Sequence, residues 1–247
     1  MAQAQDAPDN VELGAQTAPD FDCEADSFRF IRDLIRKHEG RSCTPYIPPI
    51  GKSSATISTG LDLGQHSVAS LRAMQIQEEV VQRLAPLAGK SAAAARPLLA
   101  TGGFTLTPEE NDAVEEAIVR HFIRTTATAY DEALRRAHAD SEKNSAESMS
   151  MNSKPHSARR GDSFVPAAFA KLPKELQAPV VSVLFQHGRP KAVPRFWRCV
   201  TSGNWMNAVT EMRHFYTRPT PLLKRREQEA DVLLIGIGRL VQAECLA

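Results

Sequence analysis

Apolar residues recur every three or four positions along most of the chain, and this spacing predicts a mainly helical protein. The first such stretch, residues 27–39, ends at Glu39-Gly40, where glycine suits the position just past a helix end. The run Thr107-Pro108-Glu109-Glu110 favours a helix start, with a capping threonine, a proline in the first turn and a glutamate three residues after the cap. We expect that helix to reach about Leu134 and to join two lobes. Helical spacing returns at about 68–84, 91–100, 172–185, 191–201, 203–213 and 219–240.

The pattern is extended between residues 43 and 63. Three prolines in this stretch exclude a helix, and residues 55–59, Ala-Thr-Ile-Ser-Thr, are β-prone. Gly60 and Gly64 permit bends on either side of Leu61-Asp62-Leu63. We therefore expect a small, irregular β-lobe, and a fold of the α+β class that is mainly α.

Two stretches lack this periodicity. Residues 1–20 are polar and predict a flexible tail. Residues 139–163 are polar and rich in serine, and we interpret them as a mobile insertion rather than a domain boundary. The expected organisation is thus one domain, residues 21–247, that carries this insertion.

Composition narrows the class of protein. The 247 residues include 42% apolar and 24% charged residues, which is typical of a soluble globular protein. The net charge of +1 gives no argument for binding to nucleic acid or to an anionic membrane. No apolar run is long enough to span a membrane. The first 16 residues have neither the basic nor the apolar part of a signal peptide, so we expect delivery by another route.

Histidines and cysteines show no metal-ligand spacing, so we predict no metal site. The four cysteines form no Cys-x-x-Cys pair. Free thiols and one disulfide both remain open for Cys23, Cys43, Cys199 and Cys245.

Two acids in the N-terminal part are candidates for glycosidic bond hydrolysis. That reaction needs one carboxylic acid to protonate the leaving oxygen and one carboxylate to activate water or support the cationic centre. Glu39 stands at the end of the first helix, and Asp62 is the second acid in this region, after a stretch of hydroxyl and aromatic residues. Thr56 could orient a water, and Tyr46 could stack on a sugar. The alternative is a solvated helix-end glutamate and a turn aspartate.

The spacing of these residues resembles that of the phage-type lysozymes. In that family a catalytic Glu-Gly pair ends the first helix, a tyrosine follows seven residues after the glutamate, and a Thr-Ile-Gly-x-Gly strand comes next. The corresponding residues here are Glu39-Gly40, Tyr46 and Thr56-Ile57-Ser58-Thr59-Gly60. The longer run 56–65, TISTGLDLGQ, more closely resembles the lysozyme domain of pesticin-like bacteriocins and related antibacterial effectors.

The C-terminal third contains further segments in the order of the same family. Residues 183–188, VLFQHG, resemble its helix ending in Phe-Gln-x-Gly, and residues 203–208 resemble its Trp-x-x-Ala helix. Residues 215–227 resemble its Trp-Tyr segment followed by two arginines. The resemblance covers roughly residues 24–138 and 172–240.

One departure concerns the second acid. Phage lysozymes place an aspartate nine residues after the glutamate, and here that position is Pro48. The pesticin-like pattern places it six residues after the threonine, which is Asp62.

The resemblance implies a two-lobed lysozyme-like fold, with a small β-lobe facing a larger helical lobe across a cleft and a long helix joining them. It implies hydrolysis of the β-1,4 bond between N-acetylmuramic acid and N-acetylglucosamine in peptidoglycan, without a cofactor. Glu39 would donate the proton, and Asp62 would act on a water held by Thr56. Substrate would contact Tyr46, Ser58, Thr59, Gln65 and Gln186.

The expected delivery favours an injected, monomeric antibacterial effector that acts in the periplasm of a target cell, with a cognate immunity protein that binds the cleft. A phage endolysin of the same activity is the alternative. A non-catalytic peptidoglycan-binding module that kept the fold is a second alternative, because position 48 lacks the acid. A chitinase or lytic transglycosylase is a third.

Overall fold

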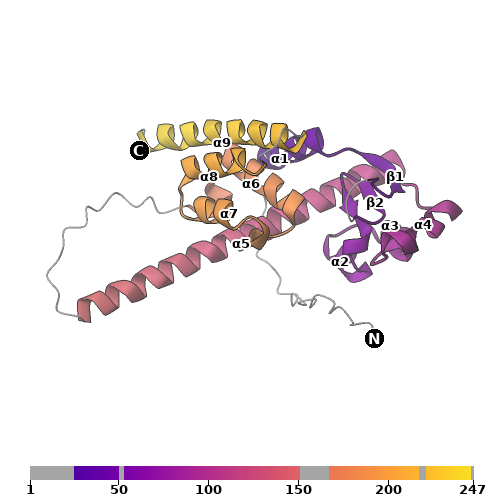
Figure 1. Cartoon of the computed structure of the whole chain (residues 1–247), viewed down its shortest axis with the longest axis horizontal. Helices are drawn as coiled ribbons and strands as arrows, with labels where there is room; N and C mark the ends of the chain where they lie inside the picture. Colours follow the sequence, from indigo (N-terminus) through magenta and orange to yellow (C-terminus); the bar gives the residue numbers. More distant parts are fainter. Residues whose placement is uncertain (1–24, 50–52, 151–166, 217–220, 246–247) are drawn as a thin grey trace.

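The computed structural model describes residues 25–49, 53–150, 167–216 and 221–245. The predicted tail, residues 1–20, and residues 151–163 of the predicted insertion lie outside these ranges. In the described part, helices predominate over one three-stranded sheet (Figure 1). The helices are α1 (Ala25–His38), α2 (Val68–Ala73), α3 (Glu78–Leu84), α4 (Ala92–Thr101), α5 (Pro108–Ser150), α6 (Lys174–His187), α7 (Pro194–Thr201), α8 (Trp205–Arg213) and α9 (Pro221–Cys245). The strands are β1 (Ser42–Tyr46), β2 (Thr56–Ser58) and β3 (Leu61–Asp62).

The buried apolar residues form two cores, and α5 contributes to both. Val114 and Ile118 of α5 belong to the core of the small lobe, together with residues of the sheet and of α2, α3 and α4. Val119, Ile123 and later residues of α5 belong to the core of the helical lobe, with α1 and α6 to α9. Figure 1 shows α5 running from the small lobe along the helical lobe. The predicted α+β, mainly α fold with two lobes and a joining helix is confirmed.

The sheet has the order β1-β2-β3 with antiparallel neighbours. In the β2–β3 pair, Thr56 lies opposite Asp62 and Ile57 lies opposite Leu61. Directly opposed residues project from the same face. Ile57 and Leu61 are buried in the core of the small lobe, so Thr56 and Asp62 share the other face. Gly60, with φ +98°, makes the turn between the strands.

The start of α5 has the predicted capping box. The amide of Glu110 donates to the Thr107 hydroxyl at 3.1 Å, and the amide of Thr107 donates to the Glu110 carboxylate at 2.8 Å. The helix continues to Ser150 instead of ending near Leu134, so residues 139–150 of the predicted insertion are helical.

The stretch 68–84 was expected to be one helix, and this is wrong in detail. Two helices, α2 and α3, are separated at Gln75, where φ is +67° and the right-handed helix cannot continue. Met74 and Ile76 on either side are buried, so the break turns both side chains into the small-lobe core.

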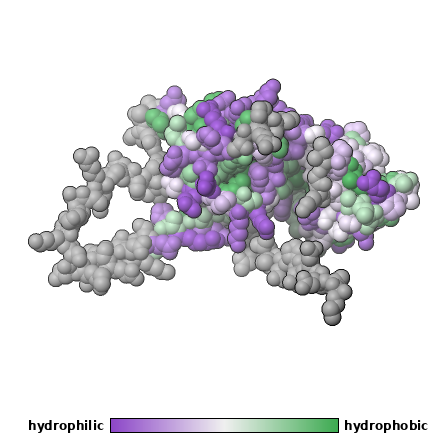
Figure 2. All heavy atoms as spheres, in the orientation of Figure 1, coloured by the Kyte–Doolittle hydropathy of each residue, from purple (hydrophilic) through white to green (hydrophobic). Residues whose placement is uncertain are grey.

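The face drawn in Figure 2 shows mainly hydrophilic residues over the helical lobe, with apolar residues between them. Among the described residues, no helix has the length and apolarity needed to cross a membrane. Cys43 and Cys199 are free thiols, and Cys23 lies outside the described residues.

The close contact of α6 with α9 depends on a glycine. A Cβ at Gly236 would lie 2.6 Å from Cδ2 of Leu176 and 3.0 Å from the carbonyl carbon of Glu175. Both Leu176 and Glu175 are buried, so neither can move away freely. Gly238, two residues further along α9, has nothing within 4 Å of the same position.

We predict that Gly236→Ala lowers the free energy of unfolding by about 1–3 kcal/mol, because the added methyl overpacks the α6–α9 contact. Gly238→Ala is the matched control on the same helix. It should raise stability by about 0.5–1 kcal/mol, because alanine favours a helix interior over glycine. Urea unfolding of the two variants measures both effects, and equal changes would contradict this account of the contact.

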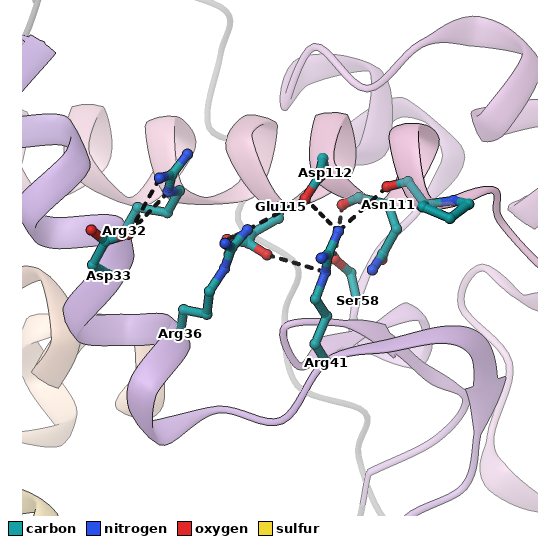
Figure 3. A network of polar contacts seen from close by, with 9 residues as sticks. Arg32, Asp33, Arg36, Arg41, Ser58, Asn111, Asp112 and Glu115 are labelled. Carbon is teal, nitrogen blue, oxygen red and sulfur yellow. Dashed lines mark hydrogen bonds and ion pairs between the residues drawn. The ribbon is translucent and has the colours of Figure 1, made fainter.

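A network of ion pairs holds the segment between α1 and β1 against α5 (Figure 3). The guanidinium of Arg36 donates to Glu115 Oε1 at 2.8 Å, and Nε of Arg41 lies 3.6 Å from Glu115 Oε2. Arg41 also donates to Asp112. Glu115 is buried, whereas Asp112 is largely exposed. The buried carboxylate thus anchors both ends of the segment that includes Glu39.

Glu115→Gln should lower the free energy of unfolding by about 1–3 kcal/mol, since it weakens charge-assisted hydrogen bonds to two arginines. Asp112→Asn removes an exposed carboxylate from the same network. It should change the free energy of unfolding by less than about 0.5 kcal/mol. Thermal or urea unfolding provides the comparison. A larger loss in Asp112→Asn would show that the exposed pairs carry the anchoring.

Candidate active site

Glu39 follows directly after α1 and lies between the two lobes. Phe28, Ile31 and Ile35 pack α1 into the helical lobe, and the Glu39 amide donates to the Ile35 carbonyl at 2.9 Å. The Glu39 side chain is 23% exposed. Its Oε1 accepts from Arg225 of α9, and its Oε2 faces the β2–β3 turn, 3.5 Å from where a Cβ on Gly60 would lie. One carboxyl group therefore binds a side chain of the helical lobe and faces the turn of the small lobe.

Asp62 lies at the end of β3, two residues past that turn. Its Oδ1 accepts from the amides of Ser54 at 3.1 Å and Gly64 at 3.0 Å, and so caps the short 3₁₀ helix Leu63–Gln65. The partly buried side chain is thereby fixed in orientation. Thr56, opposite Asp62 in the sheet, is buried, and its hydroxyl donates to the Ser54 carbonyl at 3.2 Å.

The predicted substrate-binding residues of the small lobe differ in accessibility. Tyr46, at the end of β1, is 44% exposed, and Gln65 is also exposed. Ser58 and Thr59 are 1% and 0% exposed, and the Ser58 hydroxyl donates to the carbonyl of Asn111 in α5 at 3.4 Å. Sugar contact stays a prediction for Tyr46 and Gln65, and the burial of Ser58 and Thr59 does not support it for these two.

Gln186, at the end of α6, belongs to a polar cluster on the helical side. Its Oε1 accepts from Arg226, and its Nε2 donates to the Tyr216 hydroxyl at 3.4 Å. Arg226 in turn pairs with Glu229 at 2.5 Å, and Glu229 pairs with Arg225 at 2.9 Å. Through these contacts the structure links Gln186 to Glu39.

Sequence reasoning missed the roles of Arg225 and Glu229. Arg225 lies within the segment 215–227 that resembles the family, and Glu229 lies two residues after it. The available signal was their spacing of four on α9, next to residues Ala230 and Leu233 that lie in the core. Charged residues on the buried face of a helix need partners within the protein. Arg225 pairs with Glu229 on its own helix and with Glu39 from near the other end of the chain.

The electrostatics follow from burial and from these pairs. Burial opposes the charge of Arg225, but the carboxylates of Glu39 and Glu229 outweigh it and raise the pKa of Arg225. Burial lowers the pKa of Arg226 to about 10, so this side chain is still cationic at neutral pH. Burial, with Arg225 nearby, lowers the pKa of His38 to about 4. His38 is therefore neutral near pH 7.

A cavity of about 340 Å³ opens beside this cluster. It lies among the ends of α6, α7 and α8, and its lining includes His187, Arg195, Glu211, Phe215 and Tyr216. A ligand in this cavity would find charges of both signs and aromatic rings. In the described part of the chain, no group of three or more His, Cys, Asp or Glu residues could hold a metal ion.

Comparison with known proteins identifies the family. A comparison with curated proteins gives no match. The family model "Pesticin: Bacterial toxin homologue of phage lysozyme, C-term" matches residues 30–206, which include Glu39, Thr56, Asp62 and Gln186. This match spans more than half of the chain and agrees with the two-lobed fold. The chain therefore belongs to the pesticin family of bacterial toxins homologous to phage lysozyme.

Proposed function

We propose that the protein is a muramidase that hydrolyses the β-1,4 bond between N-acetylmuramic acid and N-acetylglucosamine in peptidoglycan. The observation that carries this proposal is the position of the Glu39 carboxyl group, held by Arg225 on one side and facing Gly60 on the other. A glycan strand that lies along the turn between β2 and β3 would meet a partly exposed acid there. Membership of a family homologous to phage lysozyme supports the same reaction.

In the proposed mechanism, Glu39 gives its proton to the glycosidic oxygen as the bond from that oxygen to the anomeric carbon breaks. A water adds to the anomeric carbon, and the carboxylate of Asp62 orients that water and takes its proton. Thr56 shares a face of the sheet with Asp62 and would help to hold the water. Arg225 would stabilise the Glu39 carboxylate that remains after proton transfer.

We further propose that the protein is an antibacterial effector, delivered into the periplasm of a target cell and countered by an immunity protein that covers the site around Glu39. Family membership among bacterial toxins supports the antibacterial role. A phage endolysin is the alternative, and binding of a co-encoded small protein at nanomolar concentration would favour the effector.

Glu39→Gln should lower the rate of cell-wall hydrolysis by about 10²–10⁴-fold, because it removes the proton donor and keeps the shape of the side chain. The rate is measured by release of muropeptides from purified sacculi. Glu116→Gln, at a partly exposed position on α5, is the control and should keep the wild-type rate. A Glu39→Gln protein as active as the wild type would remove Glu39 from the mechanism.

Asp62→Asn should lower kcat by orders of magnitude with little change in KM, because the lost interaction belongs to the transition state. Asparagine keeps an oxygen that can accept from the Ser54 and Gly64 amides, so the melting temperature should stay close to that of the wild type. Asp62→Ala should lose both activity and stability. If Asp62→Asn is active and Asp62→Ala is only unstable, Asp62 is a capping residue alone.

Mass spectrometry of the products separates hydrolysis from a transglycosylase, which forms anhydro sugars.

A further inference from the structure

Behind Glu39, one buried carboxylate serves two buried arginines. Arg225 is 5% exposed, and Arg226 and Glu229 are 0% exposed. Glu229 Oε1 accepts from Nε of Arg225 at 2.9 Å and from the Ser182 hydroxyl at 2.6 Å. Glu229 Oε2 lies 2.5 Å from a terminal nitrogen of Arg226. Glu229 is therefore the shared counterion of both guanidinium groups.

The charges of this cluster depend on the state of Glu39. With Glu39 ionised, two positive and two negative charges balance. With Glu39 protonated, as a general acid must be, one positive charge is uncompensated. If the charge of Glu229 were also removed, two positive charges would be uncompensated. Positive charge close to a carboxyl group disfavours its protonated form, and this effect is strong where water is excluded.

Other charged and titratable groups lie near this cluster. Lys37 and His38 precede Glu39 at the end of α1, and His187 on α6 and Tyr216 after α8 lie near Arg226. Asp62 on β3 follows the turn that Glu39 faces. Burial lowers the pKa of His38 to about 4 and also lowers the pKa of His187, so neither ring adds positive charge near pH 7. Lys37 is exposed, and Asp62 is bound to backbone amides. The balance between Arg225, Arg226 and Glu229 thus dominates the buried side of Glu39.

We propose that Glu229 is a positioning residue that acts through Arg225: by offsetting the two arginines, it lets Glu39 hold the proton that the reaction needs. Arg225 contacts Glu39 and Glu229 with different nitrogens, so Glu229 also aims the guanidinium at Glu39. The inference rests on the proposed function for its catalytic meaning. Its physical core, the control of Glu39 protonation, is measurable without any substrate.

The experiment follows the Glu39 carboxyl carbon by ¹³C NMR across a pH titration, with Glu39→Gln used to assign the signal. In Glu229→Gln, the pH at which Glu39 loses its proton should fall by about one pH unit, because a negative charge is removed. Hydrolysis requires protonated Glu39, so the alkaline limb of kcat/KM should move to lower pH by the same amount. The KM at acidic pH should stay near the wild-type value.

The double variant Arg226→Met/Glu229→Gln restores the charge balance, because it removes one positive with one negative charge. The pH at which Glu39 loses its proton and the pH of the alkaline limb of kcat/KM should both return close to the wild-type values. Arg226→Met alone should move the Glu39 midpoint to higher pH. These variants also decide the matter if Glu229→Gln does not fold, since an unpaired buried arginine is destabilising.

Glu175→Gln is the matched control. Glu175 is also buried and pairs with Arg239 at 3.0 Å across α6 and α9, but it lies in the first turn of α6, about 10 Å along the helix from Ser182. It should leave the Glu39 midpoint unchanged. The inference would be overturned if a folded Glu229→Gln variant kept the wild-type Glu39 titration midpoint. It would also be overturned if Arg226→Met kept that midpoint. A wild-type protein that does not cleave sacculi would instead refute the proposed function, while the NMR titration would still test Glu229.

Discussion

The sharing of α5 between two cores is the constraint on which the rest of the structure depends. Val114 and Ile118 pack into the small lobe, and Val119 and Ile123 pack into the helical lobe, on consecutive turns of one helix. A rigid helix with both cores attached fixes the distance between the lobes. The buried Glu115 then binds the segment that leaves α1 to the same helix. Glu39 is therefore placed by α5 although it lies outside that helix, in the segment between α1 and β1.

Burial of charge is the second constraint, and it shapes the site. Isolated buried ions are costly, so each of Arg225, Arg226 and Glu229 needs partners. The helical lobe satisfies this need with Ser182 and Gln186 of α6. The contact of Arg225 with Glu39 reaches a partly exposed group. The arrangement keeps the guanidinium of Arg225 rigid, because its other nitrogens are bound inside the protein. In the proposed mechanism, a rigid donor beside Glu39 would be preorganised for the charge that appears there during proton transfer.

Sequence periodicity was sufficient for the elements and their order, because the relevant patterns are local. The capping box at Thr107 and the end of α1, found at His38 and expected at Glu39, are examples. The break at Gln75 was missed, since Met74 and Ile76 fit a helical pattern and only tertiary packing turns them inward on either side of a left-handed residue. The length of α5 was missed because its last turns are polar and look like an insertion.

The candidate site was predictable only in part, for a similar reason. Glu39 and Asp62 stand in one sequence region, and the family pattern relates them. The contact of Glu39 with Arg225 joins residues that are 186 positions apart, and no local rule predicts it. The burial of Ser58 follows from the packing of the sheet against α5, where its hydroxyl meets the Asn111 carbonyl.

The place of the second acid has a structural consequence. At position 48 an acid would lie in the loop after β1, outside the sheet. Asp62 instead lies in register with Thr56 across two hydrogen-bonded strands, and its own oxygen is tied to two amides. A group on a strand is held more firmly than one on a loop. The same turn that joins these strands, at Gly60, is the one that Glu39 faces. The β2–β3 hairpin therefore holds Asp62, the proposed water-orienting group, and the turn that faces Glu39 in one unit, and a shift of this hairpin would move both together.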